Sequence, residues 1–196
     1  MQLDILKESS NTNCEALCWF ETIGDVTNVY SLYFYKQEEI LPAWMEVMDA
    51  YPIYFCIQVA DGFEDGLEEC CYKHGIDFYI RRQFANADIY GVVIKNKQQF
   101  IYLFPFVELI KTMEDIVLWS TKKDCFTVDE KKKTDGILDF PINVHFDKDT
   151  TVFNFCMCGL NLMVLTNEPI FESFATIKKS LPDFVDMTIS EYAEND

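Results

Sequence analysis

Runs of β-branched and aromatic residues, separated by helix-starting signals, constrain the fold of this chain most strongly. Residues 29–35 and 53–59 are apolar or aromatic almost throughout, which is typical of strands. The second run lacks polar alternation and therefore indicates an interior strand. Between the two runs, Pro42 precedes a short segment rich in Trp and Met, and proline is favoured at the first position of a helix. The pattern predicts a strand, a helix and a second strand.

The same pattern continues along the chain. Further strands are predicted at residues 76–82, 89–94, 99–104, 116–120, 152–158, 160–165 and 184–189. The residues between the two strands at 89–94 and 99–104 predict a hairpin turn at 95–97, and Gly159 predicts another between 152–158 and 160–165. Further helices are predicted from Asp61 to Gly75, from Pro105, and from Asn167 to Pro182. We expect an α+β fold, with α/β as the alternative, in which a mixed, largely antiparallel sheet carries about four helices as a single pair of layers.

Length and composition favour one domain over residues 1–196. Seventeen Phe, ten Tyr and three Trp with only seven Gly describe a chain rich in core material, unlike a disordered acidic segment. Residues 121–149 have few apolar positions and predict a long loop or mobile excursion, and residues 190–196 predict a frayed tail. The first residues do not form a signal peptide. We therefore expect a cytoplasmic protein whose cysteines are buried, reduced thiols.

The acidic excess is unevenly distributed. Residues 1–70 hold fourteen Asp and Glu but only Lys7 and Lys36, so twelve of the seventeen net negative charges lie in the first third. Residues 71–133 are mildly basic, and residues 134–196 are acidic again. Compact folding brings like charges together at a cost in self-repulsion. Two explanations stand side by side: solubility alone, or a basic partner that neutralises the charge.

The strong acidity of the chain argues against some classes of binding partner. Nucleic acid requires clustered Lys and Arg, and an anionic membrane surface requires the same, so we expect neither. We expect a basic protein partner, and a homo-oligomer remains possible.

Acidic side chains cluster at two places. On the predicted helix after Asp61, apolar residues share one stripe and carboxylates the other face, which gives a first partner-binding set: Asp61, Glu64, Asp65, Glu68 and Glu69. The helix near Pro42 gives a second set: Glu38, Glu39, Glu46 and Asp49. Trp44 and Phe63 are candidate apolar anchors, because binding energy concentrates in aromatic residues. Each set is also what the solvated face of a helix looks like.

No pattern points to a reaction. Zinc would need four Cys, His or carboxylate ligands, and the spacing of Cys14 with Cys18, or of Cys71 with His74, supplies two each. Cys70, Cys71 and His74 equally fit the buried stripe of their helix, so whether they bind metal stays open. His145 alternates with apolar residues, which predicts a strand or loop position with an ordinary hydrogen bond. We predict no catalytic residue, no metal and no cofactor, because no hydrolase, kinase, phosphate-loop or dinucleotide motif is present.

In charge, size and fold class the chain resembles bacterial immunity proteins, although it shares no motif with them. The resemblance implies a cytosolic, non-enzymatic antitoxin that inhibits a basic, nuclease-like toxin by covering its cationic surface. Two alternatives stay open. One is a small-molecule enzyme or sensor with a pocket between sheet and helices. The other is a self-assembling structural subunit whose exposed aromatic surface is covered by copies of itself.

Overall fold

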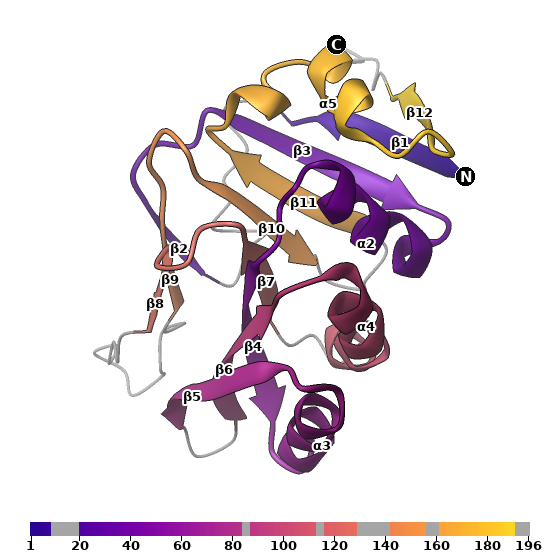
Figure 1. The fold of residues 1–196 in the computed structure, drawn as a ribbon. Helices are drawn as coiled ribbons and strands as arrows, with labels where there is room; N and C mark the ends of the chain where they lie inside the picture. The colour runs from indigo at the N-terminus through magenta and orange to yellow at the C-terminus, as the bar shows by residue number, and fades with distance from the viewer. Residues whose placement is uncertain (9–19, 84–86, 113–115, 129–141, 156–160, 191–196) are drawn as a thin grey trace.

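The computed structural model of the chain describes residues 1–8, 20–83, 87–112, 116–128, 142–155 and 161–190 (Figure 1). A nine-stranded sheet forms its centre, with strand order β12-β1-β3-β11-β10-β7-β4-β6-β5. Its strands are β1 Gln2–Lys7, β3 Asn28–Phe34, β4 Ile53–Ala60, β5 Asp77–Gln83, β6 Ala87–Ile94, β7 Val117–Ser120, β10 Thr151–Phe155, β11 Asn161–Thr166 and β12 Asp186–Ile189. Only the β1–β12 pair is parallel in this sheet. The predicted largely antiparallel, mixed sheet is confirmed.

In the described part of the chain, four α-helices and one 3-10 helix cover one face of the large sheet (Figure 1). They are α2 Gln37–Val47, α3 Glu64–His74, α4 Lys97–Lys111, η1 Pro169–Phe171 and α5 Phe174–Ser180. Across the sheet they follow each other as α5, α2, α4 and α3 (Figure 1), so α5 lies near the β1–β12 edge and α3 near β5. The predicted α+β class is therefore confirmed.

A second, three-stranded sheet covers part of the opposite face, which the sequence did not indicate. It consists of β2 Glu21–Ile23, β9 Ile142–His145 and β8 Phe126–Val128, in that order. Arg81 of β5 donates from Nη1 to the carbonyl oxygen of Phe126, over 2.9 Å, and so joins the two sheets. The middle of the large sheet is buried on both faces.

Alternation along the central strands explains these two faces. In β4, Phe55 and Ile57 belong to the core under the helices, whereas Cys56 between them belongs to the core under the small sheet. In β7, Trp119 faces the helices and Leu118 the small sheet. Side chains of a strand point alternately to opposite faces, so strands that are apolar at every position need a cover on both sides.

Trp119 lies at the centre of the helix-side core. Its ring stacks on Phe153 of β10 at 5.1 Å between centroids and on Phe55 of β4 at 5.3 Å. The side chain is fully buried. Three neighbouring strands are therefore tied together by one stack of rings.

We expect Trp119→Ala to lower the free energy of unfolding by about 3–5 kcal/mol, because it leaves a large cavity in that stack. Tyr35→Ala is the matched control: Tyr35 is 79% exposed, and its loss should change stability by no more than about 0.5 kcal/mol. Urea unfolding followed by circular dichroism measures both. Equal effects of the two substitutions would contradict the central role of Trp119.

Several predicted elements are confirmed and others are wrong. The strand over residues 99–104 is wrong, because Asn96 caps α4 by accepting from the Gln99 backbone N–H at 3.0 Å, and the segment is helical. The hairpin lies between β5 and β6 instead. Pro42 and Pro105 lie inside helices and do not open them. The helix predicted from Asp61 to Gly75 begins later, at Glu64 with Phe63 as its N-cap, and Gly75 ends it as predicted.

The region after β10 also differs in part from the prediction. Asn167 does not cap a helix: its amide nitrogen donates to the carbonyl oxygens of Asp25 and Asp147, and its Oδ1 accepts from Thr27 N–H. Ser173 caps α5 with a complete capping box. The antiparallel pairing of β10 with β11 and the last strand β12 are confirmed.

The predicted long loop is partly structured. Residues 121–149 contain β8 and β9 of the small sheet, whereas residues 129–141 lie outside the described part, as do the turn at Gly159 and the tail from residue 191. Apolar side chains such as Ile142 and Val144 are fully buried against the large sheet.

Candidate protein-interaction surface

Helices α2 and α4 pack side by side and are tied at both ends. Near one end, Lys97 Nζ lies 2.8 Å from Glu46 Oε2. At the other end, Lys111 Nζ donates to Gln37 Oε1 over 2.8 Å. The first residues of each helix therefore lie beside the last residues of the other, and the pair is antiparallel.

Lys111 is an unusual residue for this place, because it is only 9% exposed. Its ammonium group lies 4.9 Å from the ring centre of Phe155 and 3.6 Å from Glu108 Oε1. Burial lowers the pKa of Lys111, while Glu108 opposes that shift. Lys111 therefore lies inside the helix pair and neutralises part of the charge of Glu108.

A groove of about 520 Å³ runs between α2 and α4. Its floor and walls are apolar and its rim is charged. It is lined by Glu38, Glu39, Lys97, Ile101, Phe104, Pro105 and Glu108. An apolar centre with a polar rim is the usual make-up of a protein interface.

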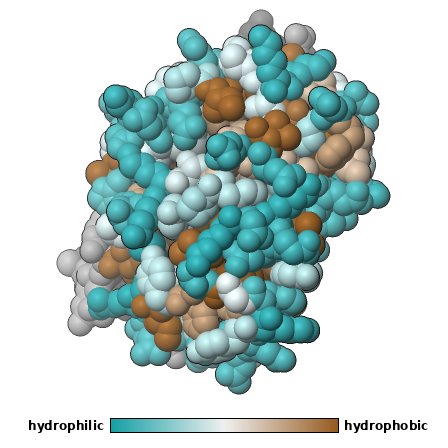
Figure 2. Space-filling view, viewed as in Figure 1, coloured by the Kyte–Doolittle hydropathy of each residue, from teal (hydrophilic) through white to brown (hydrophobic). Residues whose placement is uncertain are grey.

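The outer face of α4 carries an apolar stripe, which we define as Ile101, Pro105 and Leu109. The three residues are four positions apart, so they lie above one another on the helix. All three residues are exposed: Ile101 exposes 39% of its surface and Leu109 exposes 44%. Tyr102, 42% exposed, lies beside them towards α3. Figure 2 shows hydrophobic residues scattered in patches among hydrophilic ones on the face of the molecule in that view.

Helices α3 and α4 are joined by three polar or ring contacts. Gln99 Nε2 donates to the carbonyl oxygen of Gly75, which ends α3 in a left-handed conformation with φ 62°. Cys70 Sγ donates to the carbonyl oxygen of Tyr102 at 3.4 Å. The rings of His74 and Tyr102 stack at 3.8 Å between centroids. The stripe and α3 are therefore held in one arrangement.

The acidic edge, which we define as Asp61, Glu64, Asp65, Glu68 and Glu69, lies on α3 and the turn before it. Asp61, Asp65 and Glu69 are exposed. Glu64 and Glu68 are half-buried: Glu64 Oε2 accepts from Gly62 N–H, and Glu68 Oε1 accepts from Tyr90 Oη–H at 3.1 Å. Within the described part of the chain, none of the five forms an ion pair. The structure thus brings the first predicted set together on one helix.

The second predicted set is less uniform. Glu39 pairs with Lys36 at 2.9 Å and Glu46 with Lys97, so their charges are largely matched. Glu38 is exposed at the groove, and Asp49 is exposed beyond the end of α2 in a left-handed conformation with φ 52°. Two of the four charges are therefore matched, whereas Glu38 and Asp49 form no ion pair within the described residues.

The two predicted aromatic anchors are not exposed. Trp44 is fully buried, packs against Phe153 and Phe171, and donates from Nε1 to Ser180 Oγ at 3.0 Å. Its assignment as a partner-binding residue is wrong, because it faces the sheet and not the solvent. Phe63 is half-buried against the same core.

The residues considered for metal binding or nucleophilic chemistry have other contacts. Cys71 is buried, and burial raises the pKa of its thiol to about 12, which disfavours a reactive thiolate. Over the described ranges, no group of three or more His, Cys, Asp and Glu is arranged to hold a metal ion. His145 lies in β9 with Nε2 2.9 Å from Thr127 Oγ1, which confirms the predicted strand position with an ordinary hydrogen bond.

Comparison of the chain with protein-family models, with curated proteins and with solved structures gave no match. Every helix in the described part of the chain is too short or too polar to span a bilayer.

We expect Ile101→Gln and Leu109→Gln each to change the free energy of unfolding by less than about 0.5 kcal/mol, because both side chains already face water. Leu103→Ala on the buried face of the same helix is the comparison, with an expected loss of about 2–5 kcal/mol. Thermal unfolding of the three variants measures this difference. A loss at Ile101 or Leu109 as large as that at Leu103 would mean that the stripe serves packing.

Proposed function

We propose that this chain is a binding protein that captures a basic protein partner through α3 and α4. The finer proposal is an antitoxin of the immunity type, which inhibits a nuclease-like toxin by covering its cationic surface. The observation that carries the proposal is the unmatched acidic edge beside an exposed apolar stripe. The stripe supplies apolar area to bury, and the carboxylates supply attraction and orientation.

Charge accounting on the helix layer supports this surface over the rest. Residues 61–75 hold five carboxylates and one lysine, whereas α2 and α4 with Lys36 hold four carboxylates and three lysines. Charges of one sign gathered at one place raise the association rate with a partner of opposite sign. Such attraction is screened over about 10 Å at 0.1 M salt. Partner capture should therefore weaken as ionic strength rises.

The same accounting disfavours self-assembly through this surface. In a twofold dimer, the same patch of each copy faces its counterpart. Two acidic edges would then approach each other, and like charges facing each other across an interface cost free energy. A basic partner that covers the stripe meets no such repulsion.

The test is affinity capture from a lysate of the source cells with a charge-reversed variant. We choose Asp61→Lys, Asp65→Lys and Glu69→Lys together, because these three carboxylates are exposed, whereas Glu64 and Glu68 have hydrogen bonds inside the protein. The captured proteins are identified at low and at high salt, and association rates are measured with the purified partner. We expect the association rate at low salt to fall by about tenfold or more.

The matched control reverses three exposed carboxylates near the opposite edge of the sheet: Glu172, Asp183 and Asp186. It changes the net charge by the same amount and leaves α3 and α4 intact. We expect the control to bind like the wild type. If both variants bound the partner equally weakly, the effect would be one of net charge alone. If neither variant lost affinity, the acidic edge would not be part of the interface.

The antitoxin proposal has its own readout. If the captured partner degrades nucleic acid, adding the wild-type chain should stop the degradation at equimolar amounts, and the α3 variant should not. A captured partner that is basic but has no toxic or nuclease activity would leave the binding function in place and overturn the antitoxin assignment.

A further inference from the structure

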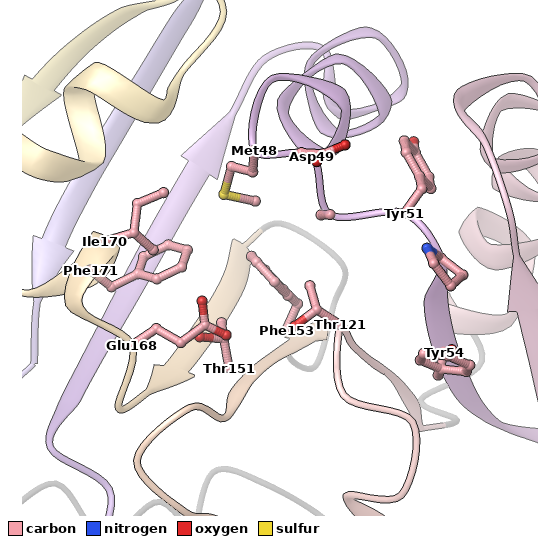
Figure 3. Close-up of a pocket in the computed structure, with 12 residues that line it drawn as sticks. Met48, Asp49, Tyr51, Tyr54, Thr121, Thr151, Phe153, Glu168, Ile170 and Phe171 are labelled. Carbon is pink, nitrogen blue, oxygen red and sulfur yellow. The ribbon is translucent and has the colours of Figure 1, made fainter.

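A second hollow lies apart from α3 and α4, at the end of α2 (Figure 3). It has a volume of about 370 Å³. The residues come from the end of α2 and the turn after it, the start of β4, the end of β7, the start of β10, and η1 with the residue before it. They are Met48, Asp49, Ala50, Tyr51, Pro52, Tyr54, Thr121, Thr151, Phe153, Glu168, Ile170 and Phe171. We call this hollow the Glu168 pocket.

Hydrogen bonds between strand residues fix its polar side. Thr151 Oγ1 and Thr166 Oγ1 lie 2.6 Å apart in the buried β10–β11 pair. Glu168 N–H donates to the same Thr166 Oγ1 at 3.0 Å, and Ser120 Oγ–H donates to the carbonyl oxygen of Thr151 at 2.6 Å. The backbone that carries Glu168 is thus anchored to the large sheet, and its carboxylate has a defined place.

Figure 3 shows the Glu168 carboxylate beside Thr151, directed into the pocket. Glu168 is half-buried, and burial raises its pKa, while hydrogen bonds from Thr151 and Thr121 oppose the shift. Within the described residues, Glu168 has no Lys, Arg or His as an ion-pair partner. Asp49 in the lining and nearby Asp149 add further negative charge. The pocket therefore holds a partly desolvated carboxylate with no cation to pair with it.

The remaining walls are mixed: Asp49, Tyr51, Tyr54 and Thr121 carry polar groups, and the other side chains are apolar. Phe171 and Ile170 lie on one side of the Glu168 carboxylate, Phe153 lies across from them, and Met48 closes the pocket from above (Figure 3). Aromatic faces attract organic cations, and thioether side chains adapt to apolar ligands. A pocket of a few hundred Å³ that places a carboxylate beside apolar side chains has the size typical of small-ligand sites.

We propose that the Glu168 pocket binds a small organic cation: an amine or guanidinium group paired with the Glu168 carboxylate, on an apolar body packed against Met48 and Ile170. The proposal goes beyond partner binding, because no residue of α3 or α4 lines the pocket. An anionic ligand of the same shape would meet Glu168, Asp49 and Asp149 without a compensating cation, and a neutral one would gain no ion pair.

The test uses three probes of similar shape and different charge: phenethylamine, 2-phenylethanol and 3-phenylpropionate. Each is titrated into the full chain and followed by the backbone amide signals of residues in the pocket, such as Ala50, Thr121 and Thr151. We expect saturable shifts at these amides with phenethylamine, and affinity at least about tenfold weaker with the other two. Equal affinity for the amine and the alcohol, or no shift at these amides, would overturn the proposal.

Two variants separate the charge of Glu168 from its shape. Glu168→Gln keeps the size of the side chain and removes its charge, and we expect amine affinity to fall by about tenfold or more. Glu172→Gln, which neutralises the exposed residue after η1, is the matched control and should bind like the wild type. Unchanged amine binding in Glu168→Gln would contradict the assigned pair.

A lysine or arginine of a protein partner carries the same cationic chemistry. The capture experiment with Glu168→Gln distinguishes that source. Lost partner capture without amine binding to the wild type would overturn the small-ligand site and place Glu168 in the partner interface. Retained capture together with amine binding supports the pocket as a separate site.

Stability as a function of pH gives a readout that does not need the ligand. Because the pKa of Glu168 is raised in the folded protein, ionisation of this carboxyl costs stability above its folded pKa, and that cost disappears below the ordinary glutamate value of about 4.3. The other titratable groups around it are Asp49, Asp149, Tyr51 and Tyr54. Glu168→Gln should therefore melt at a higher temperature than the wild type at neutral pH and show no such gain below pH 4. A lower melting temperature at neutral pH would show that the carboxylate stabilises the fold, against the proposal.

Discussion

The packing of Trp119 between Phe55 and Phe153 is the contact on which the rest of the structure depends. It joins β4, β7 and β10. These strands are neighbours in the sheet although they lie far apart in the chain. Together the three rings give the sheet a broad aromatic face that must be kept from water. Helices α2 and α4 supply that cover with buried residues such as Trp44 and Phe100. The residues on the outer faces of these two helices are then not needed for packing.

Because the buried faces of the helices cover the sheet, the exposed residues of the helix layer do not serve packing. A helix that buries Leu103, Phe104, Val107 and Ile110 has no structural need for Ile101 and Leu109 at its surface. The charge asymmetry of the sequence likewise becomes an asymmetry in space. Within the described residues, Glu39 and Glu46 of α2 pair with lysines, whereas no carboxylate of α3 does. Apolar area and unmatched charge lie next to each other, which is why we assign partner binding to α3 and α4.

Residue patterns predicted the sheet better than they predicted the helices. Strands β3, β4 and β10 are mostly apolar or aromatic and largely buried, which leaves few other conformations for such runs. The N-terminal part of α4 is as rich in aromatic and β-branched residues as a strand, and only Asn96, with Gln99 three positions later, marks it as a helix. That capping pattern was available in the sequence and outweighs β-propensity here.

The candidate sites were predicted unevenly for a similar reason. The acidic face of α3 follows from helical spacing alone, so the sequence located it. Trp44 was misplaced, because spacing cannot tell which side of α2 faces the sheet when most of that helix is apolar. The Glu168 pocket combines residues from four separate stretches of the chain. No local pattern marks such a set, since only the strand order brings Thr121, Thr151 and Glu168 together.

The joint between α3 and α4 has a consequence for binding energetics. Because Gln99 holds the last turn of α3, and Tyr102 holds Cys70 and His74, the carboxylates and the stripe keep a fixed spacing before any partner arrives. A surface that is already ordered loses little conformational entropy on association. More of the free energy released by each contact can then appear as affinity, even for an interface of modest area.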